Sequence, residues 1–222
     1  FANSSTGNKY SLWVNVYGVS ERYLNVYGEK DLRAQMNQFF HRTYTHPVDG
    51  TTLDMKMLCN WYWYDETAIL ETGKGTKDWN FYRYAETLLS AAEAIAQSSG
   101  VNAEAAGYLA QVKARANMEG KDVSTIASEL QRLGKQAFIE ECWKERLREF
   151  PLEMKIWDDC VRTGKFPQIS ATNKGEVQFV DLIGAKNGSG ATFKATDLYW
   201  PIPVNEIQRN PNLTQNEGYS AK

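Results

Sequence analysis

The most informative stretch of the sequence is Leu198-Tyr199-Trp200-Pro201-Ile202-Pro203, which continues through Asn210-Pro211-Asn212-Leu213 to Gln215-Asn216-Glu217-Gly218-Tyr219. Its three prolines exclude a regular helix or a central strand, because each proline fixes φ and removes a backbone donor. A disordered tail would lack the apolar residues spaced along it, which are Trp200, Ile202, Ile207, Leu213 and Tyr219. We therefore predict an extended C-terminal strap over residues 198–219, held on the body of the protein by these apolar anchors.

Length and charge bound the class of protein. A chain of 222 residues can bury a substantial core, and we expect a single domain over residues 1–222. The net charge of -2 offers no basis for binding nucleic acid or an anionic membrane surface. No apolar run approaches the ~18 residues that a membrane span requires.

The cysteines give no sign of a metal or redox site. The three cysteines are Cys59, Cys142 and Cys160. Their number is odd and they show no CxxC spacing, so we expect neither a zinc or thioredoxin-type site nor a cofactor. The last two fall on predicted apolar helix faces, where a free cysteine behaves as a small hydrophobe. One disulfide stays open as an alternative.

Helical periodicity is strongest in the middle of the chain. Residues 78–97 are predicted as a helix, with Asp78 as the N-cap and apolar side chains, Phe81 and Tyr84 among them, at helical spacing. Asn102 is predicted to cap a second helix that runs to about residue 117. Small residues on both helices would let them approach closely, as in an αα-hairpin of the tetratricopeptide kind: Ala91, Ala92, Ala94, Ala105 and Ala106.

Weaker patterns complete the predicted architecture. Further helices are predicted over residues 31–40 and 135–150, and a fifth helix begins at Pro151 and ends at Gly164. A turn is predicted over residues 46–50, a strand over 58–64 and a loose hairpin over 175–195. The fold class is therefore mainly α, with tetratricopeptide-like helical hairpins, long ordered loops and minor strand content.

The sequence offers few candidates for catalysis. Its two histidines, His41 and His46, lack metal-ligand spacing, and no nucleophile elbow, phosphate loop or HExxH motif occurs. Carboxylates adjacent in sequence, such as Asp158 and Asp159, would point about 100° apart on a helix. We therefore predict no catalytic residues and no enzyme, and we expect the arginines of the helices to pair with carboxylates that lock helices together. A glycosidase pair assembled from distant loops stays open.

One segment carries both ingredients of a sugar-binding surface, flat aromatic rings and hydrogen-bonding groups. A sugar ring has an apolar face that packs on an aromatic ring and a rim of hydroxyls that bind amides or carboxylates. In an extended conformation Trp61 and Trp63 would share one side of the segment and Tyr62 and Tyr64 the other, so one pair would face the ligand while the other packs inward. The candidate ligand-binding residues are therefore Asn60, Trp61, Tyr62, Trp63 and Tyr64. Weaker candidates of the same kind lie upstream, at Trp13, Tyr17, Tyr23 and Tyr27. The alternative is a strand whose aromatic residues cover the helical layer.

Three blocks of sequence resemble the SusD/RagB family, in the family order. The first is Tyr82-Arg83-Tyr84-Ala85-Glu86 with the Ala92-Glu93-Ala94 that follows, and the second runs from Glu145-Arg146 through Glu149-Phe150 to Gly164. The C-terminal strap is the third, so the matched region covers residues 78–219. In the second block Met154 stands where the family usually has glycine.

The resemblance implies a SusD-like, mainly α fold and a binding function without catalysis. Family members are outer-membrane, cell-surface lipoproteins that bind nutrients, chiefly oligosaccharides or polysaccharides, and deliver them to a SusC-like TonB-dependent porin. Because they are longer than this sequence, the chain is expected to be the C-terminal portion of one. Membrane contact would occur only through an N-terminal lipid upstream of this sequence. Two alternatives stay open: a tetratricopeptide-like scaffold for a peptide or protein partner, and a helical glycan-active enzyme.

Overall fold

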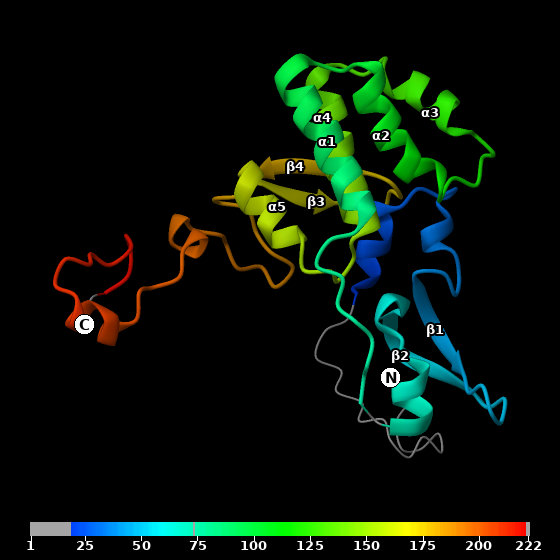
Figure 1. Ribbon diagram of the computed structural model, residues 1–222, viewed down its shortest axis with the longest axis horizontal. Coiled ribbons are helices and arrows are strands. Elements are labelled where there is room, and N and C mark those ends of the chain that lie inside the picture. The colour runs from blue at the N-terminus through cyan, green and yellow to red at the C-terminus, as the bar shows by residue number, and fades with distance from the viewer. Residues whose placement is uncertain (1–18, 73, 221–222) are drawn as a thin grey trace. The chain divides into compact units, whose positions relative to one another are not determined.

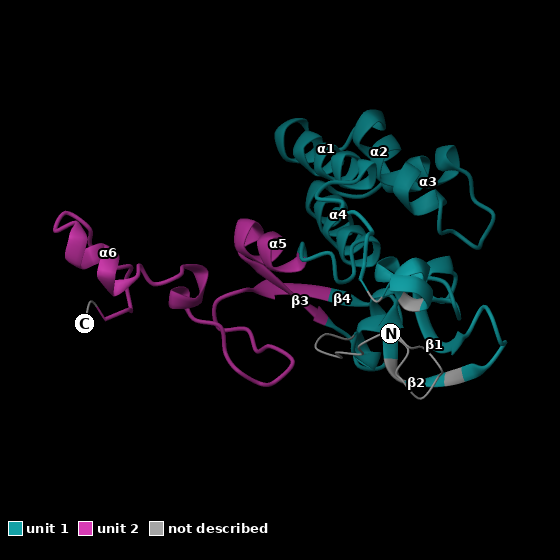
Figure 2. Cartoon of the chain, turned by 60° about the horizontal axis from the view of Figure 1, so that its bottom comes forward, with its two compact units in different colours: residues 1–155, 169–177 teal, residues 156–168, 178–222 magenta. Residues whose placement is uncertain are grey.

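The computed structural model describes residues 19–72 and 74–220, and the chain divides into two compact units. Unit 1 comprises residues 1–155 and 169–177, and unit 2 comprises residues 156–168 and 178–222 (Figure 2). Unit 1 contains most of the helices, so the prediction of a mainly α fold is confirmed.

The helical layer of unit 1 is built from α1 (Tyr84–Ser99), α2 (Ala103–Ala114), α3 (Val123–Leu130) and α4 (Lys135–Glu149). α1 packs against both α2 and α4, and α3 packs against α2 (Figure 1). The predicted close approach of α1 and α2 is confirmed, and five alanines of the two helices have no solvent exposure: Ala92, Ala96, Ala105, Ala106 and Ala110. Of the predicted set, Ala91 is only half-buried and Ala94 is exposed. An alanine seam brings two backbones together without loss of side-chain entropy.

The capping residues explain where most of these helices begin. Asn102 accepts a hydrogen bond from the Ala105 amide at 2.9 Å, as the sequence predicts for the start of α2. Asp122 caps α3 in the same way through the Thr125 amide at 2.8 Å, although the sequence analysis did not predict this helix. The predicted helix over residues 135–150 is confirmed as α4.

The predicted start of α1 at Asp78 is wrong, because the helix begins six residues later. Arg83 occupies the N-cap position with extended φ and ψ of -120° and 153°, and its side chain makes no capping hydrogen bond. Its guanidinium instead binds Glu149 and Glu153, far along the chain. These contacts hold the approach to α1 in an extended conformation, so the residues before Tyr84 lie outside the helix.

The predicted helix start at Pro151 is also wrong. Residues 151–154 form turns, and α5 (Ile156–Thr163) begins only after them. Leu152 and Met154 have positive φ values of 59° and 60°, a conformation that no α-helix contains. The position where the family usually has glycine is thus one that favours glycine, since this region of φ costs other residues roughly 1–2 kcal/mol.

The N-terminal part of unit 1 holds two 3₁₀ helices, η2 (Glu21–Val26) and η3 (Leu32–Ala34), and an antiparallel hairpin of β1 (Phe40–Thr45) and β2 (Thr52–Asn60). The predicted turn over residues 46–50 joins the two strands. The predicted helix over residues 31–40 is wrong, since only η3 is helical there. The predicted strand over residues 58–64 ends at Asn60, and η4 (Trp61–Trp63) is a 3₁₀ turn.

Unit 2 contains α5, most of the two-stranded sheet of β3 (Lys165–Ile169) and β4 (Val177–Asp181), the 3₁₀ helix η6 (Ala195–Leu198) and α6 (Val204–Arg209). The predicted loose hairpin over residues 175–195 is confirmed in part: Lys186 pairs with Thr192 in an antiparallel bridge within it, whereas β4 pairs with β3, which lies upstream. The side chain of Phe193 packs against Trp157 and Phe166, at centroid distances of 5.7 and 5.2 Å.

The C-terminal strap is partly helical, so the exclusion of a regular helix was wrong. α6 fits between Pro203 and Pro211, because a proline is tolerated just before a helix and the next one comes after its end. The prediction that Trp200 anchors the strap is wrong, because this side chain is 90% exposed. The rest of the strap is irregular and is held by its own polar side chains. Gln215 exchanges two hydrogen bonds of 2.8 Å with the Ile202 backbone, and the Tyr219 hydroxyl lies 2.9 Å from the Thr196 carbonyl oxygen.

Candidate functional site

A cleft of about 460 Å³ opens in unit 1. Its lining comes from η3, the junction of β2 and η4, the approach to α1, the end of α2 and the end of α4. Aromatic side chains lie beside charged ones in this lining: Leu32, Arg33, Gln38, Phe39, Asn60, Trp61, Tyr62, Arg83, Arg115, Ala116, Glu149, Pro151 and Glu153. The cleft thus includes three of the predicted sugar-binding residues.

Asn60 shapes the cleft through the backbone. Its side-chain oxygen accepts from the Tyr62 amide at 2.7 Å, which caps η4, and its side-chain nitrogen donates to the Pro151 carbonyl oxygen at 2.9 Å. The residue is buried. Both ends of its amide are therefore engaged within the protein, where they set the turn that presents the aromatic side chains.

The predicted alternation of the aromatic segment is wrong, because a 3₁₀ turn does not place alternate side chains on one side. Trp61 is stacked on His41 at a centroid distance of 3.6 Å and on Tyr64 at 4.6 Å. The rings of His41 and Tyr64 lie so close to Trp61 that they cannot share one face of its indole, so both faces of Trp61 are covered. Tyr64 packs inward against buried Tyr44. Trp61 therefore offers the cleft an edge of its ring.

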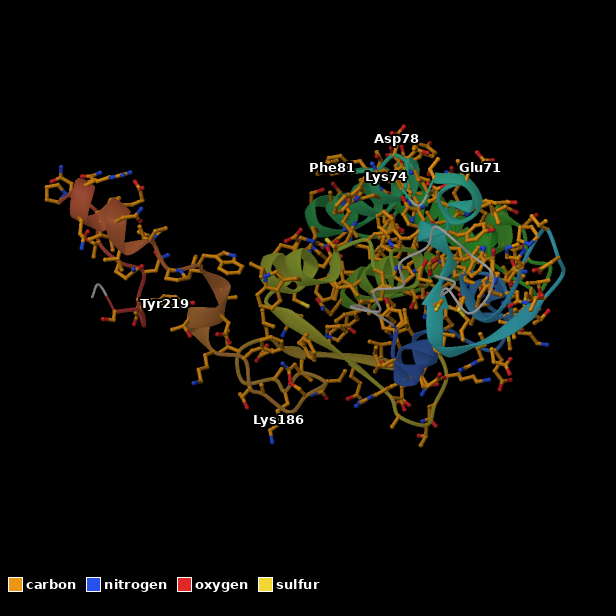
Figure 3. The ribbon with its side chains drawn as sticks, turned by 90° about the horizontal axis from the view of Figure 1, so that it is seen from below. Glu71, Lys74, Asp78, Phe81, Lys186 and Tyr219 are labelled. Carbon is orange, nitrogen blue, oxygen red and sulfur yellow. The ribbon has the colours of Figure 1, made fainter. Side chains whose placement is uncertain are left out.

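Tyr62 and Trp63 lead out of the cleft to a second aromatic surface. The Tyr62 ring lines the cleft and meets the edge of Trp63 at 4.9 Å. Trp63 in turn contacts Trp79 at 5.6 Å, and Trp79 stacks on Phe81 at 5.9 Å. We call Trp63, Trp79 and Phe81 the outer aromatic row. In Figure 3 the side chains of Phe81, Asp78 and Lys74 lie along the same edge of unit 1.

Trp79 is not among the site residues predicted from the sequence, and Phe81 is predicted on a helix face. The structure contradicts that assignment, since Phe81 precedes α1 and is 72% exposed, while Trp79 is 50% exposed. The signal was present in Asp78-Trp79-Asn80-Phe81, where aromatic residues alternate with polar ones at the period of an extended chain. Trp13 and Tyr17 lie outside the described residues.

A network of arginines and glutamates forms the charged side of the cleft. Glu149 is fully buried, and its two oxygens accept from three guanidinium groups, those of Arg33, Arg83 and Arg115. Glu153 binds Arg83 through both oxygens, at 2.7 and 2.9 Å. As the sequence predicts, these arginine–carboxylate pairs join separate elements, here the approach to α1 and the end of α4.

The network extends inward along α4, where Glu145 is fully buried. Burial opposes ionisation of this carboxyl, but the charges of Arg33, Lys113 and Arg148 hold its pKa well below the usual range. For Arg83, burial would lower the pKa, yet hydrogen bonds with Glu153 and Glu149 raise it above its ordinary value. Glu145 and Arg83 are therefore both ionised at neutral pH.

The arrangement suits binding better than acid–base chemistry. A general acid or base needs a carboxyl group that can exchange a proton with substrate. The cleft carboxylates, Glu149 and Glu153, instead accept from guanidinium groups at every oxygen. Within residues 19–72 and 74–220, no three His, Cys, Asp or Glu side chains gather as a metal site would require.

Comparison with known proteins relates this fold and site to one family. The model of the SusD family matches residues 9–219. The starch-binding protein SusD of Bacteroides thetaiotaomicron is 36% identical over 138 residues, which are 62% of this chain and 21% of that protein. A solved SusD superfamily protein from Parabacteroides distasonis superposes with a TM-score of 0.74 at 31% identity, over 90% of this chain and 41% of that one. The chain thus spans less than half the length of either relative, and it belongs to the SusD family.

Proposed function

We propose that the cleft and the outer aromatic row together bind an oligosaccharide without catalysis. The observation that carries the proposal is the continuous aromatic path from Tyr62 in the cleft through Trp63 and Trp79 to exposed Phe81. Flat rings beside polar groups match the apolar faces and hydroxyl rims of sugars. The starch-binding relative supports the same class of ligand.

The proposal that the cleft does not catalyse a reaction is supported by the network of arginines and glutamates that forms its charged side. Its carboxylates are bound to guanidinium groups, so neither Glu149 nor Glu153 is free to act as acid or nucleophile in the way that a glycosidase pair does. Family membership supports a wider role. In this wider role the protein is an outer-membrane lipoprotein at the cell surface, and it delivers its ligand to a TonB-dependent, SusC-like transporter. No helix within the described residues combines the length and apolarity of a membrane span.

Calorimetric titration of the full chain with a panel of neutral and acidic oligosaccharides tests the proposal. We expect at least one ligand to bind, and Trp79→Ala and Trp63→Ala each to weaken it about tenfold, as the loss of a ring contact worth about 1–1.5 kcal/mol implies. Tyr108→Ala on α2 is the matched control, since Tyr108 lies outside the cleft lining and contacts Glu104 of its own helix. A chain that binds no oligosaccharide, or one that releases products from it, contradicts the proposal.

A further inference from the structure

The cations of the cleft are not equally neutralised. Arg33 binds Asp31 and Glu145 as well as Glu149, and Arg83 binds Glu153 as well as Glu149. Arg115 has no carboxylate of its own among the described residues: it shares Glu149 with the other two guanidinium groups. Positive charge is therefore least compensated at Arg115.

Arg115 is also the guanidinium of the cleft with the most unused donors. Of its five N–H groups, one on Nη2 donates to Glu149, and the other four have no partner among the described residues. Its side chain is 57% exposed, against 5% for Arg33 and 21% for Arg83. The guanidinium thus stays accessible at the cleft, with Glu149 holding one side of it.

The cleft has few free acceptors to match these donors. Every carboxylate oxygen of Glu149 and Glu153 is bound to a guanidinium group, and Asn60 is engaged with the backbone. Gln38 adds a side-chain amide, which offers a neutral donor and a neutral acceptor and has no partner among the described residues. A ligand that enters the cleft therefore gains most by bringing acceptors, and an ionised acceptor forms the strongest bonds with a guanidinium group.

We propose that Arg115 selects sugars that carry a carboxylate, so that the preferred ligand of this site is a glycan containing uronic acid. The carboxylate would bind the planar fork of Arg115, a geometry that a neutral hydroxyl does not reproduce. The sugar ring would pack against the aromatic lining at Phe39 and Tyr62. This inference rests on the proposed function, because it names the substrate class of the same site.

The test compares oligogalacturonate with its methyl ester, which keeps the ring and removes the charge, within a panel that also holds neutral glucan, mannan and xylan oligosaccharides. We expect acid-bearing ligands to bind about tenfold or more tightly than neutral ones, and added salt to weaken that binding. Arg115→Gln should remove the preference while leaving weak binding of the neutral forms. Arg115→Lys should restore it in part, since lysine keeps the charge and loses the fork.

Arg132→Gln is the matched control, because Arg132 is exposed and lies outside the cleft lining, and thermal melts verify that each variant folds. The inference is overturned if neutral oligosaccharides bind as tightly as acidic ones, or if Arg115→Gln leaves the preference intact. In both cases the proposed glycan binding stands. If no member of the panel binds, the proposed function fails and the inference fails with it.

Discussion

Replacement of Glu145 by glutamine probes the buried network that joins η3 to the helical layer. Glu145 is fully buried on α4, with Nη1 of Arg33 at 2.8 Å, Nη1 of Arg148 at 3.2 Å and Nζ of Lys113 at 3.6 Å. Glutamine keeps the shape of the side chain and removes its charge. Each cation nearby would then lose one of its anionic partners.

The magnitude follows from what remains paired. Removal of one partner from a buried ion pair costs about 3–5 kcal/mol, because it leaves an uncompensated buried charge. Here Arg33 retains Asp31 and Glu149, and Arg148 retains Glu141, so the lower end applies. We expect a loss of about 3 kcal/mol in the free energy of unfolding at pH 7, or a drop of about 6–12 °C in the melting temperature.

The loss of unfolding free energy caused by Glu145→Gln should become smaller as the pH falls. The pKa of Glu145 is lowered in the folded state from its ordinary value of 4.5, so the stability that this residue contributes is complete above about pH 4.5 and is lost as the pH falls towards the folded pKa. At pH 3 the native protein should have lost about 2 kcal/mol of that contribution, at 1.36 kcal/mol per pH unit. The difference between native protein and Glu145→Gln should therefore narrow to about 1 kcal/mol.

Urea unfolding followed by circular dichroism at pH 7 and pH 3 measures both effects. Glu140→Gln on the same helix is the control, since Glu140 is partly exposed and its one hydrogen-bond donor among the described residues is Gln136. Its effect should stay within about 0.5 kcal/mol. The reasoning is refuted if the two variants unfold at the same urea concentration, or if the deficit of Glu145→Gln is as large at pH 3 as at pH 7.

Three other predictions concern single local features. Asn102→Ala removes the cap that binds the Ala105 amide and should cost about 1 kcal/mol in urea unfolding; an unchanged midpoint would contradict the assignment of the cap. Gly218→Ala should open the C-terminal strap to proteolysis, because a Cβ there overlaps Cγ2 of Thr196, whereas Gly120→Ala, also at positive φ but in open space, measures the backbone cost alone. Ellman's reagent should titrate no thiol before unfolding and three after it, since burial raises the pKa of each one: Cys59, Cys142 and Cys160.

Local chemistry was sufficient to predict α2, α4 and the αα-hairpin from the sequence. The Asn102 cap, the periodic apolar residues and the alanine seam all act within a few residues along the chain, and the structure contains each of them. Family membership could be predicted for the same reason, because the three matched blocks are contiguous stretches of sequence. The pairing of arginines with carboxylates also followed from residue type.

Contacts between distant residues decided what the sequence did not reveal. α1 starts at Tyr84 because Arg83 binds Glu149 and Glu153, which lie 66 and 70 residues away along the chain. The aromatic segment divides between core, cleft and outer row because Asn60 caps a 3₁₀ turn while it binds the distant Pro151 carbonyl. Patterns of neighbouring residues were therefore enough to predict the helical hairpin, the family and the class of ligand to propose. Which aromatic rings face solvent and which arginine keeps free donors emerge only in the folded chain, since both depend on pairings between residues far apart in the sequence.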